Sequence, residues 1–433
     1  MSPTVDPGLA SALAALGHAT GPLAIGGVPA AELAATFGTP TYVFDAVVLR
    51  RQAARVQQAL GPRVRLLWSV KANPSVAVTR ELRRAGTGAE IASLGELHVA
   101  LAAGHVAATL RFAGPGKTDA ELDAALAAGL GCFHVESADE AATLARLAAV
   151  RGVVACVALR VNFPQELSGA RMRMGGGSSR FGIDEAELDA VARAVLAQPS
   201  LRLVGLHAYA GTQVFDAAAF GRHCERVGRC LAALEQALGI VLPEIDVGGG
   251  FGVPVYGGDP LFELDAAAAA LHTVVRAHDR PERTWFVELG RFLAAPAGVY
   301  LARVVRTKRS GGHAHAVLDG GMHHAAAAAG MGAVLRRPAL MVAVAEPLRH
   351  GTPVMVGGPL CTPADQFGDG IGIGPLAAGD LVAVLHAGAY GLTFSPHSFL
   401  GHPAPAEVLV EGGVARIVRD RGQATDALRG QHP

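Results

Sequence analysis

The stretch LLWSVKAN, residues 66–73, decides how the first half of the chain can fold. Its apolar part, Leu66–Val70, has the length and the residue types of a buried strand. The strand ends at a charged residue, Lys71, which is followed by Ala-Asn-Pro. The same order, a short apolar run and then a polar residue, recurs up to about residue 290 and predicts a repeated unit of strand and helix.

Eight such apolar runs alternate with Ala/Leu-rich stretches of helical period, such as 119–128 and 184–197. The predicted strands are Leu66–Val70, Ala89–Ala92, Leu110–Ala113, Cys132–Val135, Ala155–Val161, Val204–Ala208, Glu244–Val247 and Trp285–Val287. Eight βα units in about 250 residues are typical of an α/β fold of the (β/α)8 TIM-barrel type. An open, doubly wound sheet is the alternative, but it would not place eight polar strand ends around one mouth.

The pattern changes after residue 291. Short apolar or β-branched runs are now separated by Gly and Pro, with few helical stretches, which predicts a C-terminal β-domain. The predicted strands here are Val317–Leu318, Leu340–Val344, Val354–Val356, Leu381–Leu385 and Glu407–Val410. The run Leu23–Val28 is also strand-like. We therefore expect residues 1–36 to join the β-domain, residues 37–291 to form the barrel, and residues 292–433 to form the β-domain itself.

Composition excludes several classes of function. The chain has 37 basic and 37 acidic residues, which argues against a general surface for nucleic acid or anionic membranes. No apolar run reads as a membrane span, and the N-terminus lacks the features of a signal peptide. Five irregularly spaced cysteines indicate no disulfide framework, so a reduced, cytoplasmic setting is expected.

Three strand ends carry groups that could act together on one cofactor. An amine at Lys71 could form a Schiff base with an aldehyde, the Gly248–Gly250 triplet could hold a phosphate, and the carboxylate of Glu288 could hold a pyridine nitrogen. Each group alone has an ordinary reading: a lysine that caps a strand, a tight turn, and a surface carboxylate paired with Arg291. Together they are the set of groups that pyridoxal 5'-phosphate requires.

The chain resembles the fold-type III pyridoxal-phosphate decarboxylases, the group of diaminopimelate and ornithine decarboxylases, over nearly its whole length. The motifs that carry the resemblance are Gly38–Val43, Lys71–Pro74, Gly95–Leu97, His134–Ser137, Arg180–Ile183, Gly211–Gln213, Asp246–Gly252, Asp319–Met322, Gly358–Cys361 and Gly388–Gly391. The resemblance implies an alanine racemase-like barrel with a β-domain and a head-to-tail homodimer with shared active sites. Alanine racemases resemble a pattern with arginine where this chain has Glu288, so this residue favours decarboxylation.

The resemblance also implies a role for each matched residue. Lys71 would bind the cofactor, Glu288 its pyridine nitrogen, and Cys361 of the partner subunit would return a proton after CO2 departs. The other expected cofactor contacts are Glu90 beneath the cofactor, Tyr209 on its ring, and Thr212, Gly248, Gly249, Gly250, Gly290, Arg291 and Tyr390 around its phosphate. The expected substrate contacts are Asp365, Arg337 and Arg173.

Several positions depart from diaminopimelate decarboxylases. Those enzymes have a histidine where this chain has Tyr209, and a glutamate that reads the substrate where this chain has Thr362 and Pro363. The segments 168–177 and 395–403 also differ. These departures resemble the branch that acts on amino acids attached to something larger, including decarboxylases for carrier-protein-bound glutamate or methylaspartate in antibiotic pathways, exosortase-associated decarboxylases and siderophore decarboxylases.

We therefore expect an acidic aminoacyl substrate on an acyl carrier protein. Arg171 and Arg173 are either solvated loop charges or, in the functional interpretation, contacts to the acidic group of the substrate or to its phosphopantetheine arm. Diaminopimelate decarboxylation and siderophore-precursor decarboxylation are the alternatives of the same class. A catalytically inactive binding protein is the alternative of another class, and the presence of Lys71, Glu288 and Cys361 argues against it. The histidines outside these motifs show no metal-ligand spacing, and His207 reads as a core histidine, so no metal is expected.

Overall fold

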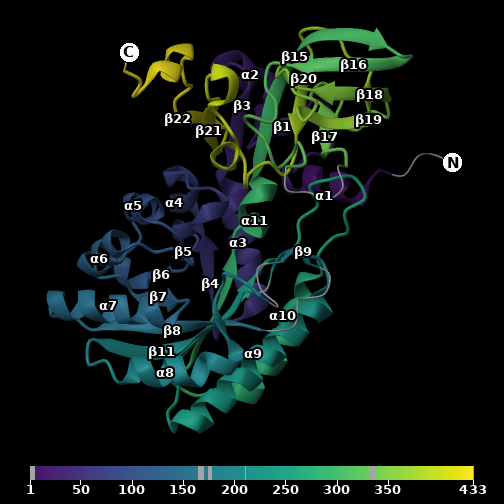
Figure 1. Ribbon diagram of the computed structural model, residues 1–433. Coiled ribbons are helices and arrows are strands. Elements are labelled where there is room, and N and C mark those ends of the chain that lie inside the picture. Colours follow the sequence, from purple (N-terminus) through teal and green to yellow (C-terminus); the bar gives the residue numbers. More distant parts are fainter. Residues whose placement is uncertain (1–4, 164–169, 174–177, 210, 332–336, 433) are drawn as a thin grey trace. The chain divides into compact units, whose positions relative to one another are not determined.

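The computed structural model describes residues 5–163, 170–173, 178–209, 211–331 and 337–432. The chain forms two compact units, each built from separate segments of sequence. The barrel unit comprises residues 52–252 and 262–292, and the β unit comprises residues 1–51, 253–261 and 293–433. Figure 1 shows both units with their elements labelled.

The barrel unit contains a closed ring of parallel strands, as predicted. Its strands are β4 (Val64–Ser69), β5 (Gly88–Ile91), β6 (Leu110–Phe112), β7 (Cys132–Val135), β8 (Ala155–Asn162), β11 (Leu201–His207), β13 (Glu244–Gly249) and β14 (Thr284–Leu289). Pairing between β14 and β4, and between β7 and β8, closes the ring. A short strand, β10 (Ile183–Asp184), adds to β8, and β9 (Ala170–Arg173) pairs with β12 (Gly211–Val214) in a separate ladder. The predicted (β/α)8 barrel is confirmed.

Most of the barrel helices connect successive strands and cover the outside of the ring, while the first precedes the barrel strands and the last follows them (Figure 1). They are α3 (Ala46–Leu60), α4 (Val76–Arg84), α5 (Leu94–Ala102), α6 (Asp119–Ala127), α7 (Ala138–Arg151), α8 (Leu188–Leu196), α9 (Ala217–Leu238), α10 (Leu264–His278) and α11 (Arg291–Ala294). Local sequence sets their ends. Thr118 and Glu121 form a capping box at the start of α6, and Gly152 ends α7 in the left-handed conformation with φ +66°.

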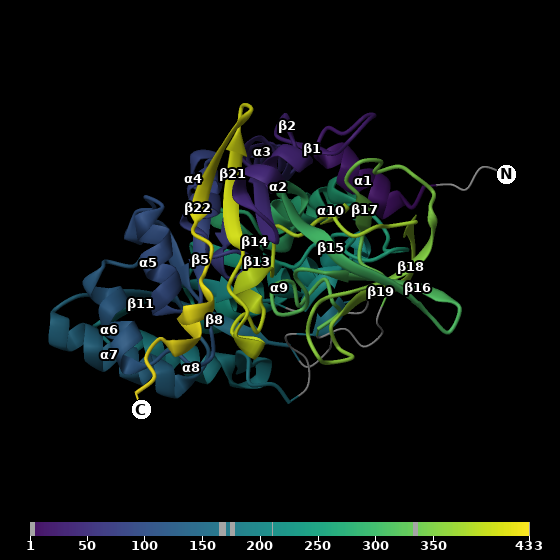
Figure 2. The ribbon, with the colours of Figure 1, turned by 90° about the horizontal axis from the view of Figure 1, so that it is seen from above.

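The β unit is built on a long mixed sheet, seen from above in Figure 2. Its strands are β3 (Thr41–Asp45), β15 (Gly298–Ser310), β16 (His313–Leu318), β17 (Met341–Ala343), β18 (Thr352–Gly357), β19 (Gln366–Gly374), β20 (Leu381–Val384), β21 (Ala406–Glu411) and β22 (Val414–Arg419). The order along the sheet is β19-β18-β16-β15-β3-β21-β22, while β20 pairs with β15 and β17. Helices α1 (Pro7–Ala15) and α2 (Ala30–Phe37) belong to the same unit.

The N-terminal run Leu23–Val28 contributes to the β unit through packing. It forms a separate two-stranded ladder of β1 (Ala24–Ile25) and β2 (Val28–Pro29). Its buried residues Leu23 and Ile25 lie in the same apolar cluster as Val43 and Val299. The strand from this part of the chain that is hydrogen-bonded into the large sheet is β3, which pairs with β15 and β21. The sequence analysis placed these residues in the barrel segment 37–291 instead. All five residues of β3 are buried, so its apolar pattern does not reveal which of two buried sheets it enters.

No helix in the described part of the chain is long and apolar enough to cross a membrane.

The buried His223 of α9 is expected to make the stability of the barrel unit depend on pH. Burial lowers the pKa of this histidine to about 4, while its Nε2 lies 3.1 Å from the carbonyl oxygen of Val247. Between pH 6.5 and this value the unfolded chain binds a proton that the native chain does not, so native stability falls as pH falls. We expect His223→Gln to reduce the pH slope of the unfolding free energy by about 1.4 kcal/mol per pH unit in this range.

Urea unfolding at several pH values between 4.5 and 7.5 measures this slope. The exposed His350 offers a matched control, because His350→Gln removes an imidazole that is in solvent. Equal slopes in the wild type and His223→Gln would contradict the prediction.

Candidate active site

Lys71 lies just past the end of β4, in a single helical turn, η1 (Val70–Ala72). Its Nζ lies 2.8 Å from both carboxylate oxygens of Glu90, at the end of β5, and 5.7 Å from the centre of the Tyr209 ring. The lysine side chain is 35% exposed, whereas Glu90 is 1% exposed. Burial raises the pKa of Glu90, and the Lys71 ammonium lowers it. A reactive amine is thus held at the carboxyl end of the barrel by a buried acid.

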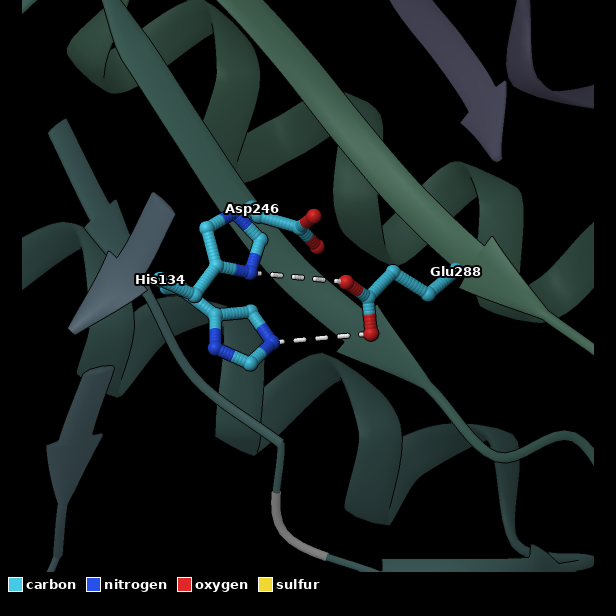
Figure 3. Close-up of side chains that lie close together, drawn as sticks. His134, Asp246 and Glu288 are labelled. Atoms are coloured by element: carbon cyan, nitrogen blue, oxygen red, sulfur yellow. Dashed lines mark ion pairs between the residues drawn. The ribbon is translucent and has the colours of Figure 1, made fainter. Parts of the chain in front are cut away.

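The carboxyl group of Glu288, on β14, lies in a buried cluster with side chains from β7, β11 and β13 of the ring. His134 of β7 places Nδ1 3.8 Å from Glu288 Oε1, and His207 of β11 places Nε2 3.5 Å from Glu288 Oε2. The two imidazole rings stack with centroids 4.2 Å apart. Figure 3 shows His134 and Asp246 directed toward the Glu288 carboxyl group. Each oxygen of Glu288 therefore faces a different imidazole.

Charge within this cluster follows from burial. Burial lowers the pKa of His134 and of His207 well below the ordinary histidine value, so both rings are neutral. Burial, followed by the nearby charge of Glu288, raises the pKa of Asp246 well above its ordinary value. The raised pKa favours the neutral form of the Asp246 carboxyl group beside Glu288. None of His134, His207 and Asp246 therefore places a positive charge beside the Glu288 carboxyl group.

This arrangement fits the pyridine nitrogen expected from the sequence. Glu288 is 2% exposed, and its Oε1 has no hydrogen-bond partner among the described residues. A buried carboxylate oxygen without a partner carries a large desolvation cost. A protonated pyridine nitrogen would supply both the missing hydrogen bond and the missing positive charge.

The glycine triplet at the end of β13, of which Gly248 and Gly249 lie within the strand, allows strand ends to approach closely. A Cβ on Gly249 would lie 2.0 Å from the carbonyl oxygen of Glu288, and one on Gly250 would lie 2.0 Å from that of Gly211. Gly248 and Gly250 also have φ of +66° and +83°. The N–H of Gly248 donates to Asp246 Oδ1 at 2.9 Å. Of the three glycine N–H groups expected to bind the phosphate, that of Gly248 therefore donates to Asp246 instead.

The other predicted cofactor residues of the barrel unit lie at the same strand ends. Gly290 follows β14, and a Cβ there would lie 2.7 Å from that of Ala72, so this glycine lets the end of β14 approach the lysine turn. Arg291 begins α11, and Thr212 lies in β12. Within the barrel unit, Lys71, Glu288 and Gly290 thus lie at the ends of the adjacent strands β4 and β14.

Four predicted residues lie in the β unit: Cys361, Asp365, Tyr390 and Arg337. Cys361 is exposed, and Tyr390 has the unusual backbone angle φ of +52°. Asp365 is 6% exposed and accepts the N–H groups of Met322 at 2.6 Å and Leu360 at 2.8 Å, so it joins two loops.

Arg337 forms an ion pair with Asp259, and its guanidinium lies 5.6 Å from the centre of the Tyr256 ring. Arg173, the remaining predicted substrate contact, is the last residue of β9. Its side chain, and that of Arg171, lie outside what the structure describes.

The sequence analysis did not assign His134, His207 or Asp246 to the site. His207 had been read as a core histidine, and the other two residues appeared only within motifs. All three lie within buried strands of the same ring, of which β13, with Asp246, is next to the strand of Glu288, whereas β7, with His134, lies on the opposite side of the ring, so the side chains meet inside the barrel. A buried polar residue at such a position is the signal that could have identified them.

These side chains also have the composition of a metal site, although no metal was expected. One ligand atom from each of His134, His207, Asp246 and Glu288 lies within 4.8 Å of the others. The unpartnered oxygen of Glu288 is an acceptor that requires a donor, and the pyridine N–H expected there from the sequence would be such a donor.

Comparisons with known proteins agree with this geometry. The family model described as the pyridoxal-binding domain of pyridoxal-dependent decarboxylases matches residues 47–295. An L-glutamyl-(BtrI acyl-carrier protein) decarboxylase from Niallia circulans is 35% identical over 91% of this chain and 94% of its own. A diaminopimelate decarboxylase from Zymomonas mobilis is 33% identical over 94% of this chain and 96% of its own. The solved structure of a diaminopimelate decarboxylase from M. jannaschii, in complex with L-lysine, superposes with a TM-score of 0.87 at 26% identity, covering 95% of this chain and 96% of the other.

Proposed function

Because the chain belongs to the pyridoxal-dependent decarboxylases, which are pyridoxal-phosphate-dependent carboxy-lyases, we propose that it removes the α-carboxylate of an acidic aminoacyl group carried on an acyl carrier protein. The decarboxylation of an amino acid with pyridoxal phosphate follows from the family. That the substrate is bound to a carrier protein is the part of the proposal that goes beyond the family. Free diaminopimelate is the main alternative, since diaminopimelate decarboxylases are nearly as similar to this chain.

Pyridoxal phosphate, when bound, supplies an electron sink that accepts the electron pair left when the carboxylate departs as CO2. Lys71 would hold the cofactor through its amine, at the mouth of the barrel where the amine of the substrate would enter. Glu90, 2.8 Å from Lys71 Nζ, is placed to accept or return the proton of that amine. These two residues therefore prepare the amine for exchange.

Glu288 would accept a hydrogen bond from the pyridine N–H and keep that nitrogen protonated. The neutral rings of His134 and His207 face its two oxygens and limit their rotation. Burial and the nearby charge of Glu288 raise the pKa of Asp246, which favours its neutral form, so that Asp246 would not add a second negative charge beside Glu288. The orientation of the Glu288 carboxyl group matters because it would fix the position of the pyridine nitrogen. The position of the cofactor in turn would determine how the bond to the departing carboxylate is aligned.

The carrier-bound substrate is supported by the residues that differ from diaminopimelate decarboxylases. Thr362 and Pro363 cannot replace the charge of the glutamate that reads free diaminopimelate in those enzymes. The segment around 395–403 exposes Phe394, Phe399 and Leu400 by 45%, 44% and 51%. Apolar side chains gathered on a surface are typical of a protein-binding region. A large, tethered substrate is consistent with both observations.

A direct comparison of substrates tests this proposal. We expect poor turnover of free diaminopimelate, lysine and ornithine, and far better turnover of a glutamyl or aspartyl group on a phosphopantetheine arm. Loss of one charged contact to a small substrate costs about 1.5–3 kcal/mol, which corresponds to roughly one to two decades of kcat/KM. Mass spectrometry that follows CO2 loss from both sets of substrates measures the difference.

Restoring the missing charge provides a matched control. Thr362→Glu should raise turnover of free diaminopimelate and leave that of the carrier-bound substrate no better than before. Efficient conversion of free diaminopimelate by the unmodified enzyme would instead assign it to lysine formation. Activity on a free siderophore precursor alone would support the other alternative.

We also propose a homodimer in which Cys361 of the partner subunit supplies the proton that replaces CO2. Cys361 is exposed in the isolated chain and lies in the β unit, as a residue acting across an interface requires. Mixing inactive Lys71→Ala with inactive Cys361→Ala should restore up to about a quarter of the activity in hybrid dimers. No recovery, despite subunit exchange demonstrated by mass spectrometry, would remove Cys361 from this role.

A further inference from the structure

A second concave site lies in the barrel unit at the amino-terminal ends of its strands. We call it the basal cavity. It has a volume of about 800 Å3 and is lined by the first residues of β4, by Gly88 at the start of β5, and by Thr109, which precedes β6. Lys71 and Glu288 follow or lie near the carboxyl ends of these parallel strands. The basal cavity is therefore distinct from the decarboxylation site.

The lining of the basal cavity carries charge of one sign. It includes Arg65, Arg83 and Arg111 and contains no aspartate or glutamate, while burial lowers the pKa of His105 to about 4 and keeps this imidazole neutral. The chain as a whole has equal numbers of acidic and basic residues, so this imbalance is local. Arg111 has a carboxylate partner, Glu244, at 3.0 Å. No carboxylate in the described part of the chain forms an ion pair with Arg65 or Arg83, so a positive potential remains in the cavity.

Three lining residues also present buried polar atoms without a hydrogen-bond partner. These atoms are Oγ1 of Thr87, Nε2 of His105 and Nε of Arg111. The three residues are only 4%, 6% and 7% exposed. Buried polar groups in folded proteins nearly always have partners, so three in one cavity point to a ligand or to ordered water. The aromatic ring of Phe286, 4.6 Å from the Arg111 guanidinium, fixes the orientation of that cation.

We propose that the basal cavity binds a small organic anion that carries phosphate or carboxylate groups. Its volume lies within the usual range of about 300–1,000 Å3 for small-molecule sites. Arg65 and Arg83 at the rim would form charge-assisted hydrogen bonds with the anion, and Thr87 and His105 would contact its polar atoms deeper in the cavity. A protein partner fits less well, because its surface would leave the buried groups of Thr87 and His105 without contacts.

Calorimetric titration of the cofactor-loaded enzyme tests this site. Inorganic phosphate, pyrophosphate and citrate are the probes, each in chloride buffer at constant ionic strength. We expect one probe molecule to bind per chain, with no change in the absorbance of the bound cofactor. The comparison of pyrophosphate with citrate distinguishes a preference for phosphate from one for carboxylate.

Two variants in the cavity and one outside it make the result specific. Arg65→Gln should weaken binding of the preferred probe about ten- to a hundredfold, because it removes a charged hydrogen bond. Thr87→Val keeps the side-chain shape and should weaken binding about two- to tenfold. Arg55→Gln is the matched control. Arg55 is exposed on α3 and does not line the cavity, so its loss should leave affinity unchanged.

The proposal is overturned if no probe binds, or if Arg55→Gln and Arg65→Gln weaken binding equally, which would indicate a general charge effect. It is also overturned if the anions displace the cofactor, because they would then occupy the decarboxylation site. Binding of an acidic carrier protein that depends on Arg65, in the absence of any bound small anion, would identify a protein-docking surface instead.

Discussion

Lys71→Ala is expected to abolish decarboxylation, with a loss in kcat of about 10,000-fold or more. Lys71 Nζ is positioned by the buried Glu90 at the mouth of the barrel, where it would hold the cofactor aldehyde. Without the amine, the substrate must react with a cofactor held only by hydrogen bonds. The variant should also lose the cofactor absorbance band that borohydride reduces. This spectroscopic readout does not depend on which substrate is correct.

The chain makes this experiment unusually clear, because it contains three lysines: Lys71, Lys117 and Lys308. The amine of Lys117 is buried against Glu140 and the carbonyl oxygen of His134, so it is engaged in the structure of the barrel. Lys308 is exposed on β15, and Lys308→Ala is the matched control. After borohydride reduction, the cofactor should be found on the peptide that contains Lys71. Retention of a reducible band in Lys71→Ala would contradict the assignment.

Glu288→Gln is expected to lower kcat about 100- to 1,000-fold. Glutamine keeps the size of the side chain between His134 and His207 but removes the negative charge that holds a proton on the pyridine nitrogen. The amide would also place a donor where an acceptor is needed. We therefore expect weaker cofactor binding and an altered absorbance spectrum in addition to slower turnover.

The control for Glu288→Gln is a carboxylate that is equally buried elsewhere in the barrel unit. Glu81 of α4 is fully buried and pairs with Arg84 at 2.8 Å. Glu81→Gln should change stability while leaving kcat and the cofactor spectrum as in the wild type. If Glu288→Gln keeps wild-type turnover and spectrum, Glu288 is not the partner of the pyridine nitrogen.

Much of the fold could be predicted from local pattern alone. The strand Cys132–Val135 was predicted to the residue, and the other barrel strands differ from prediction mainly at their ends. Buried parallel strands are continuous apolar runs bounded by polar residues, so they are distinct in a sequence. The strand β3 was more difficult to assign, because a fully buried run carries no information on its partners.

The candidate site could likewise be predicted only in part from the sequence. Lys71 and Glu288 could be named from their positions at strand ends, together with the resemblance to known decarboxylases. The surroundings of Glu288 could not. His134, His207 and Asp246 come from three other strands, and their proximity depends on the order in which the strands close the barrel.

The sequence by itself therefore determined the elements, the barrel class and the reactive groups, because these depend on periodicity and residue type within short windows. Only the tertiary structure decided that the pKa of Asp246 is raised, that two neutral histidines face Glu288, and that Gly248 donates to Asp246. It also decided that Arg65, Thr87 and Arg111 line one cavity. Burial and the distance between charges set these properties, and both arise only when residues far apart in the chain are packed together.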